Sequence, residues 1–466
     1  MPFIPHSSQD IDLMLQAIGA ENIEQLFEEI PKNLRAKPFT KIPEGLTEQA
    51  MTRLMLERSN QDGVDLNFLG AGAYEHHIPW AIWDLVSRGE FMTSYTPYQA
   101  EASQGNLQLI YEYQSMMSSL MAMECSNASM YEGGSSLAEA VLMSVRCHKN
   151  SQSRKILILG DLNPRYREVL ETIVKHQKII LEFISADKKS RNIYEGQDIT
   201  AVIIPQPNFF GVLQAVDELT DWAHAQKSLV IGLVNPIAMS LLKPPGEWGS
   251  PGENQGADIV CGEGQSLGVP LASGGPYFGF MCCRKEWIRQ MPGRIVGKTL
   301  DLEGKEGFCL TLQAREQHIR RSKATSNICT NQGLLVAAAT IYMALLGQHG
   351  LAQVAKQSHL NAMALKNKLE KIEGIKIIHT GPWFHEFVIN LPAPVTAERV
   401  IINLASHGIQ AGLDLFKLLP EMGQCLLICS TEVHSPADHD RYVSALMHVL
   451  YEAKMEQVLN QEAITC

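Results

Sequence analysis

The sequence predicts an α/β fold, with a large domain built on a mainly parallel sheet and a smaller C-terminal α+β domain. Six short apolar runs recur between about residues 155 and 283, and most are separated by enough chain for a helix. Such runs are typical of βαβ units, whose parallel strands are buried on both faces. After residue 330 a long apolar helix is followed by shorter strands and one helix.

The six runs are the expected strands of the large domain. Their sequences are KILILG (155–160), KIILEFIS (178–185), TAVIIPQP (200–207), KSLVIGLV (227–234), ADIVCGEG (257–264) and PYFGFMCC (276–283). The last follows a glycine-rich turn, and we expect it to be antiparallel to the others.

The C-terminal part has a different pattern of predicted strands and helices. IKIIH (375–379), HEFVINL (385–391) and CLLICS (425–430) indicate strands, and a helix is expected near 396–407. Residues 1–62 show amphipathic helical patterns without a core of their own. We therefore predict a helical arm at 1–62, a large domain at 63–335 and a small domain at 336–466.

Composition excludes several classes of protein. The 466 residues contain 39 Lys and Arg against 50 Asp and Glu, a net charge of −11, which argues against a nucleic-acid or anionic-membrane partner. The ten cysteines show no CxxC spacing and the first residues show no signal-peptide pattern, so a reduced, cytoplasmic setting is expected and no metal site is indicated. The longest apolar stretch, residues 334–346, is shorter than the about 20 residues of a membrane span.

A glycine- and serine-rich turn precedes a helical pattern at YEGGSSLAEA. Main-chain N–H groups of Gly133, Gly134, Ser135 and Ser136 would converge at the helix start, where a phosphate binds readily. Ordinary capping by Ser135 or Ser136, with Glu139 completing the cap, explains the same residues. Both interpretations stay open from the turn alone.

Two further segments have the composition of binding loops. The loop 93–106 and the basic run 313–333 each also admit the simpler interpretation of a solvated surface. In the basic run, a carboxylate or phosphate site is at least as good an explanation. PQPNFFG (205–211) ends a strand and displays two phenylalanines that look exposed. The candidate residues of the two binding segments are Tyr95, Thr96, Tyr98, Gln99, Ser103 and Gln104, and Arg315, His318, Arg320, Arg321, Lys323, Thr325 and Asn327.

Together these segments resemble one family, the pyridoxal-phosphate-dependent P-protein of the glycine cleavage system. The resemblance rests on SYTPYQAEASQGNLQ, NASMYEGGSSLAEA, PQPNFFGV, GADIVCGEGQSLGVPLASGGPYFGF and the long string from MPGRIVGKTLDLEG to HIRRSKATSNICTNQ, and it covers nearly the whole chain. It implies a fold of the pyridoxal-phosphate transferase type (fold type I). The length is similar to the half-size form of the family, in which two different subunits replace one polypeptide, and the chain resembles the subunit that lacks the cofactor.

The residues themselves test that resemblance. Enzymes of this fold hold the cofactor on a lysine placed after a strand and before a glycine-rich turn, but no lysine occurs between Lys243 and Lys285. Gln265 and Ser266 stand where the pattern has His-Lys, and a serine hydroxyl cannot form an imine. Asn235 stands where an Asp would hold the pyridine nitrogen, and Asn163 where the family commonly has His.

The resemblance implies a heterotetramer with two subunits of each kind. The partner would hold pyridoxal phosphate, and the pair would decarboxylate glycine and pass the aminomethyl group to the lipoyl arm of the H-protein. We expect the residues of the two binding segments to line the pocket between unlike subunits, with Tyr95, Tyr98 and His318 first. Two alternatives remain at this point: a self-sufficient pyridoxal-phosphate enzyme, which needs the missing lysine, and a cofactor-free regulatory or scaffolding relative.

Overall fold

The structure is a computed structural model that describes residues 6–36, 40–148, 151–252 and 255–465. The chain divides into two compact units, residues 1–63 and 64–466. Each unit is described by itself.

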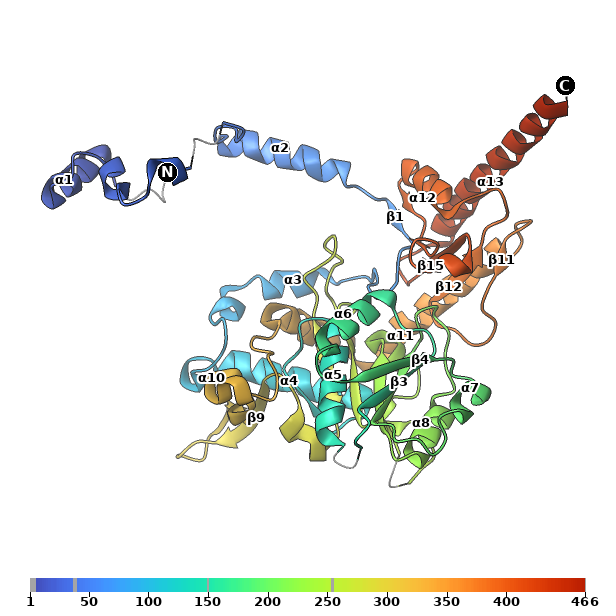
Figure 1. Ribbon diagram of the computed structural model, residues 1–466, viewed down its shortest axis with the longest axis horizontal. Helices are drawn as coiled ribbons and strands as arrows, with labels where there is room; N and C mark the ends of the chain where they lie inside the picture. Colours follow the sequence, from blue (N-terminus) through green and yellow to red (C-terminus); the bar gives the residue numbers. More distant parts are fainter. Residues whose placement is uncertain (1–5, 37–39, 149–150, 253–254, 466) are drawn as a thin grey trace. The chain divides into compact units, whose positions relative to one another are not determined.

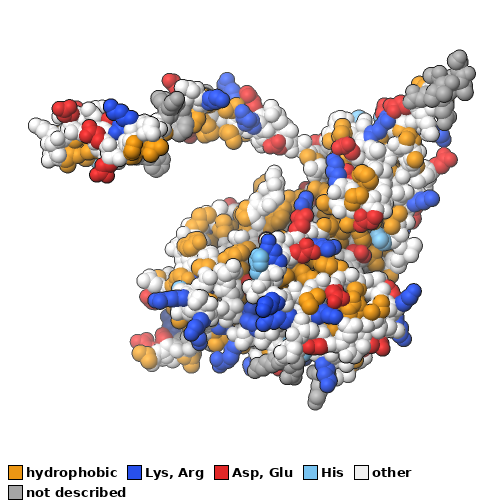
Figure 2. All heavy atoms as spheres, in the orientation of Figure 1, with side chains coloured by type: hydrophobic (Ala, Val, Ile, Leu, Met, Phe, Trp, Pro, Cys, Tyr) orange, Lys and Arg blue, Asp and Glu red, His pale blue; other side chains and the backbone are white. Residues whose placement is uncertain are grey.

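The first unit is a helical arm. It contains α1 (Ser8–Ile18) and α2 (Glu48–Gln61), with short 3-10 turns at Ile23–Phe27 and Lys32–Leu34. Helix α1 starts with a capping box, in which the Ser7 and Asp10 side chains satisfy each other's main-chain N–H groups. None of its described residues is buried, and both helices display apolar side chains on their surface (Figure 2), among them Leu13, Ile18, Met55 and Leu56.

The second unit is built around a seven-stranded sheet, and all six predicted strands of the large domain are present in it. The strand order is β2-β8-β7-β6-β5-β3-β4, and β8 runs antiparallel to both of its neighbours, as expected, while the other pairs are parallel. The strands are β2 (Cys125–Ser126), β3 (Lys155–Leu159), β4 (Ile180–Ile184), β5 (Ala201–Gln206), β6 (Leu229–Val234), β7 (Ile259–Glu263) and β8 (Gly279–Cys283).

Helices cover both faces of this sheet (Figure 1). Successive side chains of a strand point to opposite faces, so Ile156 and Ile158 of β3 pack with α5 (Gly133–Cys147) and α6 (Pro164–Val174). Leu157 and Leu159 pack in the other core, which holds side chains of α3 (Trp80–Val86), α4 (Gln104–Met121), α8 (Val216–Ala225) and α11 (Gly333–Leu369). Burial on both faces explains why the strands are continuous apolar runs.

Helix α11 is interrupted at Gly347, directly after the apolar stretch 334–346. Gly347 has φ 59° and ψ −177°, which is a non-helical conformation in the left-handed half of the map. By length and composition α11 could cross a membrane, but half of its most apolar stretch is buried inside the protein, where it packs on α4 and α3. It is a core helix here.

A second, antiparallel sheet lies in the C-terminal part, with strand order β11-β12-β15-β14. Its strands are β11 (Lys376–Ile377), β12 (Glu386–Asn390), β14 (Leu413–Asp414) and β15 (Cys425–Cys429), accompanied by α12 (Ala397–Ser406) and α13 (Pro436–Thr465). Strand β1 (Leu66–Asn67) pairs with β13 (Ile409–Gln410), so residues just after the arm join this part of the protein. The division into an arm, a large and a small domain stays a prediction, and its 335/336 boundary falls within α11.

Two features differ from the sequence-based expectations. A hairpin of β9 (Ile295–Leu300) and β10 (Glu306–Thr311) was not predicted. The two phenylalanines of PQPNFFG are buried rather than exposed: Phe209 and Phe210 pack in a small cluster with Val388 and Leu415 of the C-terminal part. The expectation of exposure was wrong because their partners come from a distant part of the chain.

Candidate functional site

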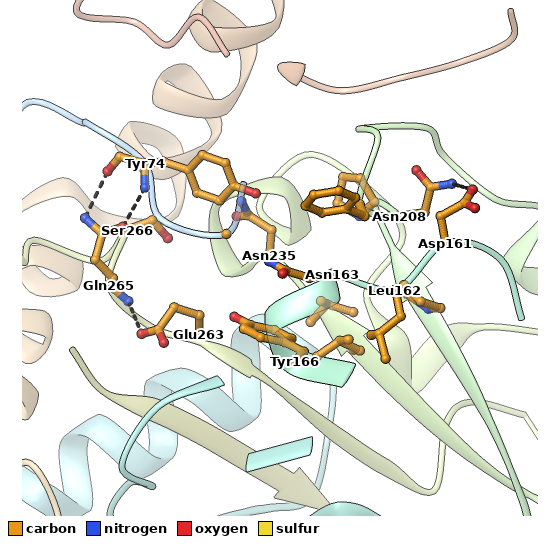
Figure 3. Close-up of a pocket in the computed structure, with 16 residues that line it drawn as sticks. Tyr74, Asp161, Leu162, Asn163, Tyr166, Asn208, Asn235, Glu263, Gln265 and Ser266 are labelled. Atoms are coloured by element: carbon orange, nitrogen blue, oxygen red, sulfur yellow. Dashed lines mark hydrogen bonds between the residues drawn. The ribbon is translucent and has the colours of Figure 1, made fainter. Parts of the chain in front are cut away.

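A pocket lies at the carboxyl ends of the parallel strands, where open α/β sheets bind their ligands (Figure 3). Residues that follow β3, β5, β6 and β7 line it, joined by Tyr166 of α6 and by Gly72 and Tyr74. Its free space is about 70 Å³, which is room for roughly five water molecules. Its lining residues are Gly72, Tyr74, Asp161, Leu162, Asn163, Tyr166, Pro205, Pro207, Asn208, Phe209, Leu233, Val234, Asn235, Glu263, Gln265 and Ser266.

Gln265 and Ser266 lie in the turn after β7, at the edge of this pocket. The Gln265 side chain accepts a hydrogen bond from the Tyr74 N–H at 2.8 Å and donates to the carbonyl oxygens of Tyr74 and Val269 at 2.9 and 2.8 Å. These three hydrogen bonds, called the Gln265 clamp below, join the main chain at Tyr74 to the turn after β7. The Ser266 side chain is buried and makes no hydrogen bond to any described residue. No lysine is among the lining residues.

The two asparagines of the pocket serve as helix caps. The Asn235 side-chain oxygen accepts from the N–H groups of Ile237 and Ala238, and its buried amide nitrogen has no partner among the described residues. Asn163 caps α6 through Arg165 and donates to the Ala71 carbonyl oxygen at 2.8 Å. Neither side chain carries a negative charge that could hold a protonated pyridine nitrogen.

Two acids, half-buried Glu263 and the more exposed Asp161, give the pocket its electrostatic character. Burial raises the pKa of Glu263 to about 8, and the nearby Glu132 carboxylate adds to the shift, against the lowering effect of the Gly133 and Gln265 N–H groups. Burial also raises the pKa of Asp161, whose carboxylate accepts from the Asn208 amide at 3.0 Å. The pocket presents acids and amides, with neither an amine nor a guanidinium among its lining residues. These residues do not fit pyridoxal phosphate. They offer no lysine for the aldehyde, and position 235 holds an uncharged amide where an acid would have to hold the pyridine nitrogen.

A second cluster joins the two binding segments. The guanidinium of Arg294, buried to 2% exposure, donates to the Tyr98 hydroxyl at 2.6 Å and lies 5.1 Å from the centre of its ring. The His318 ring meets the Tyr98 ring edge-on at 5.4 Å, and the buried Glu316 carboxylate lies 3.7 Å from Arg294 and 3.6 Å from His318. The structure thus brings Tyr98 and His318 together, as expected, above a buried charge pair.

The other predicted residues of the loop differ from one another in exposure and in contacts. Tyr95 is 87% exposed, its hydroxyl accepts from that of Thr330, and it lines a hollow with Asn331 and Leu334. Gln104 joins the start of α4 to β10 by two hydrogen bonds with the Phe308 main chain. Ser103 is buried, Thr96 is half-buried and Gln99 is exposed.

The basic run does not act as one cluster. Arg315 is half-buried and donates to the carbonyl oxygens of Met291 and Gly293, while Arg320, Arg321 and Lys323 are exposed. Arg321, Thr325 and Asn327 line a different hollow, together with Arg146 of α5. Within the run, the His318 ring lies against Tyr98 of the loop, and the Thr330 hydroxyl donates to that of Tyr95.

Sequence reasoning missed four residues that shape these sites: Glu132, Glu263, Arg294 and Glu316. All four lie inside the strings quoted above. Glu263 and Arg294 act on partners far along the chain, Gly133 and Tyr98, whereas Glu132 caps the turn that directly follows it. A glutamate directly before a Gly-Gly turn was the available signal for Glu132.

The large sheet covered by helices on both faces, the C-terminal α+β part and the pocket at the strand ends define a protein of the pyridoxal-phosphate fold type I class. This confirms the expected fold. Lactobacillus brevis glutamate decarboxylase shares this fold with a TM-score of 0.65 at 12% identity, over 90% of this chain and 96% of that one.

The chain belongs to the glycine cleavage system P-protein family, whose sequence pattern it matches over residues 1–446. The "Probable glycine dehydrogenase (decarboxylating) subunit 1" of Thioalkalivibrio sulfidiphilus is 58% identical over 457 residues, covering 97% of this chain and 100% of the relative. The solved glycine decarboxylase (P-protein) of the glycine cleavage system, in inhibitor-bound form, superposes with a TM-score of 0.85 at 37% identity, covering 96% and 100% of the two chains. The resemblance stated from the sequence is confirmed.

Proposed function

We propose that this chain is the cofactor-free subunit of a heteromeric glycine dehydrogenase (decarboxylating). One observation carries the proposal: this member of the family has Gln265 and Ser266 at the pocket edge and no lysine among the residues that line the pocket. A second subunit then holds pyridoxal phosphate, which supplies the electron sink for decarboxylation when bound. This division of labour agrees with the word "subunit" in the name of the relative.

In this proposal the exposed aromatic face around Tyr98 completes the pocket of the partner. Tyr95, Tyr98 and His318 are exposed, and buried Arg294 fixes the orientation of Tyr98 from below. Exposed aromatic residues backed by a rigid layer are typical of interfaces. In this proposal the residues from Thr96 to Gln104 support this face or its rim. The residues from Arg320 to Asn327 are kept as candidates for lining the interface, with Arg321, Thr325 and Asn327 in a separate hollow.

The substrate is glycine, and the aminomethyl group passes to the lipoyl arm of the H-protein, with two subunits of each kind in the complex. The cytoplasm is the proposed setting, because the nine cysteines that the structure describes are free thiols, as is usual in a reducing compartment.

Reconstitution tests the proposal. Each chain is purified alone, and glycine-dependent CO2 release is measured for each, for the mixture, and for the mixture with H-protein. We expect release only when both chains are present, and aminomethyl transfer only with H-protein. Release by this chain alone, or full activity of the partner without it, would contradict the proposal.

A further inference from the structure

The helix start for which a phosphate cradle was one of two open interpretations is already filled by the protein's own carboxyl groups. Helix α5 begins at Gly133, and its first N–H groups have no partner within the helix. The Gly133 N–H donates to Glu263 at 2.9 Å, and the N–H groups of Gly134 and Ser135 donate to the two carboxylate oxygens of Glu132 at 2.6 and 2.5 Å. The Ser136 N–H donates to the Glu132 carbonyl oxygen at 2.9 Å.

The two serine hydroxyls are engaged as well. Ser135 and Ser136 both donate to the Glu132 carbonyl oxygen, at 3.1 and 2.7 Å. All four N–H groups and both hydroxyls that could hold a phosphate therefore already have acceptors within the chain.

Neighbouring side chains also fill the space around this turn. A Cβ atom at Gly133 would collide with the Tyr166 hydroxyl, and one at Gly279 would collide with the Ser136 side chain. Tyr166 and Glu263 thus lie directly against the turn, where phosphate oxygens would have to approach the N–H groups. Figure 3 shows these two side chains next to each other in the pocket.

Charge opposes a phosphate further. A helix N-terminus favours one anion, and Glu132 supplies it. Burial keeps Glu263 protonated to unusually high pH, with its pKa at about 8, and the Glu132 carboxylate contributes to that shift. A phosphate dianion at this turn would be repelled by the Glu132 carboxylate, in a site where water screens poorly, and it would have to displace the protonated Glu263 from the Gly133 N–H.

We infer that Glu132 and Glu263 exclude phosphate-bearing ligands from this pocket, so that the chain rejects pyridoxal phosphate because its own carboxyl groups occupy the N–H donors that would hold the phosphate, and not only because it lacks a lysine. The consequence is specificity within a two-chain enzyme: the cofactor is directed to the partner, and this pocket cannot compete for it.

The test first restores the lysine alone and then also removes both acids. The full-length chain is prepared as Ser266→Lys, and as Ser266→Lys combined with Glu132→Ser and Glu263→Ala; serine at position 132 preserves a helix cap. Each is incubated with pyridoxal phosphate or with pyridoxal, which lacks the phosphate, and reduced with borohydride. Intact mass and peptide mapping then measure labelling at position 266.

We expect the single variant to label equally weakly with both aldehydes. The triple variant should gain about tenfold or more in apparent affinity for pyridoxal phosphate, the size of change expected when like charge is removed from an anion site, and less than about twofold for pyridoxal. Strong phosphate-dependent labelling of Ser266→Lys alone, or no phosphate-dependent gain in a folded triple variant, would overturn the inference.

A second pair of variants keeps the test decisive if the triple variant does not fold. Glu132→Gln with Glu263→Gln keeps the shape of both side chains, and Glu168→Gln with Glu171→Gln is the control pair on the exposed face of α6. Inorganic phosphate should raise the Tm of the first pair relative to chloride at equal ionic strength, and leave wild type and the control unchanged. Equal responses of all three proteins would contradict the inference. None of these measurements needs catalytic activity, so their outcome is independent of the proposed function.

Discussion

The guanidinium of Arg294 supports Tyr98 from inside the protein, donating to its hydroxyl at 2.6 Å beneath the tyrosine ring. The two residues are 196 positions apart in the chain. Because the guanidinium is buried and also faces Glu316, the orientation of an exposed aromatic side chain depends on a buried charge pair.

Removing Arg294 should destabilise the protein strongly. Arg294→Ala leaves the Glu316 carboxylate buried without its cation, and breaking such a pair costs about 3–5 kcal/mol. Urea unfolding measures the effect. Lys298→Ala, which removes an exposed pair with Glu306, is the control and should cost less than about 1 kcal/mol. Equal costs for the two variants would contradict the role given to the buried pair.

The aromatic face should matter for activity and not for assembly. We expect Tyr98→Ala and His318→Ala each to lower glycine decarboxylation by the two-chain complex roughly 10- to 100-fold, since misplaced positioning groups typically cost this much. Co-elution of the two chains should persist. Tyr451→Ala removes another exposed aromatic residue, on α13, and should leave turnover unchanged. Wild-type turnover in both variants of the face would discard the assignment.

Ser266 should be dispensable for the reaction. Its hydroxyl makes no hydrogen bond to a described residue, and the proposed chemistry takes place on the partner. Ser266→Ala should therefore change steady-state turnover of the reconstituted complex by less than about twofold, a difference below 0.5 kcal/mol in barrier height. A tenfold loss with intact assembly would show that this pocket takes part in catalysis.

The Gln265 clamp should contribute to stability. Gln265→Ala removes three hydrogen bonds to the main chain of Tyr74 and Val269, and each buried group left without a partner costs about 1–3 kcal/mol. We expect a loss of roughly 3 kcal/mol or more in urea unfolding. The control Gln108→Ala breaks only an exposed contact with Glu112 and should be nearly neutral.

Glu263 should make stability depend on pH. Its pKa of about 8 in the folded protein lies above the about 4.3 of an unfolded glutamate. The native state therefore holds a proton that the unfolded state releases, and this contribution is complete at low pH and is lost as pH rises through 8. Wild type should lose up to about 1.4 kcal/mol per pH unit relative to Glu263→Gln between pH 5 and 8. Urea unfolding at several pH values checks this, and parallel pH profiles of the two proteins would contradict it.

Much of the fold was predictable because its signals are local. Apolar runs bounded by turns mark the buried strands of the large sheet, and the glycine at position 347 marks the break in α11. The hairpin of β9 and β10 was missed because its outer residues are polar and exposed, so it lacks the continuous apolar run of a buried strand.

The sequence by itself determined the family, the sheet and the absence of a lysine where the cofactor would attach, since these follow from residue identity and short-range pattern. Only the tertiary structure decided that Glu263 reaches Gly133, that Arg294 lies under Tyr98, and that the basic run splits between two surfaces. The physical reason is that these contacts join residues more than a hundred positions apart, and whether an acid or a guanidinium finds a partner depends on which side chains the folded chain brings within hydrogen-bond distance.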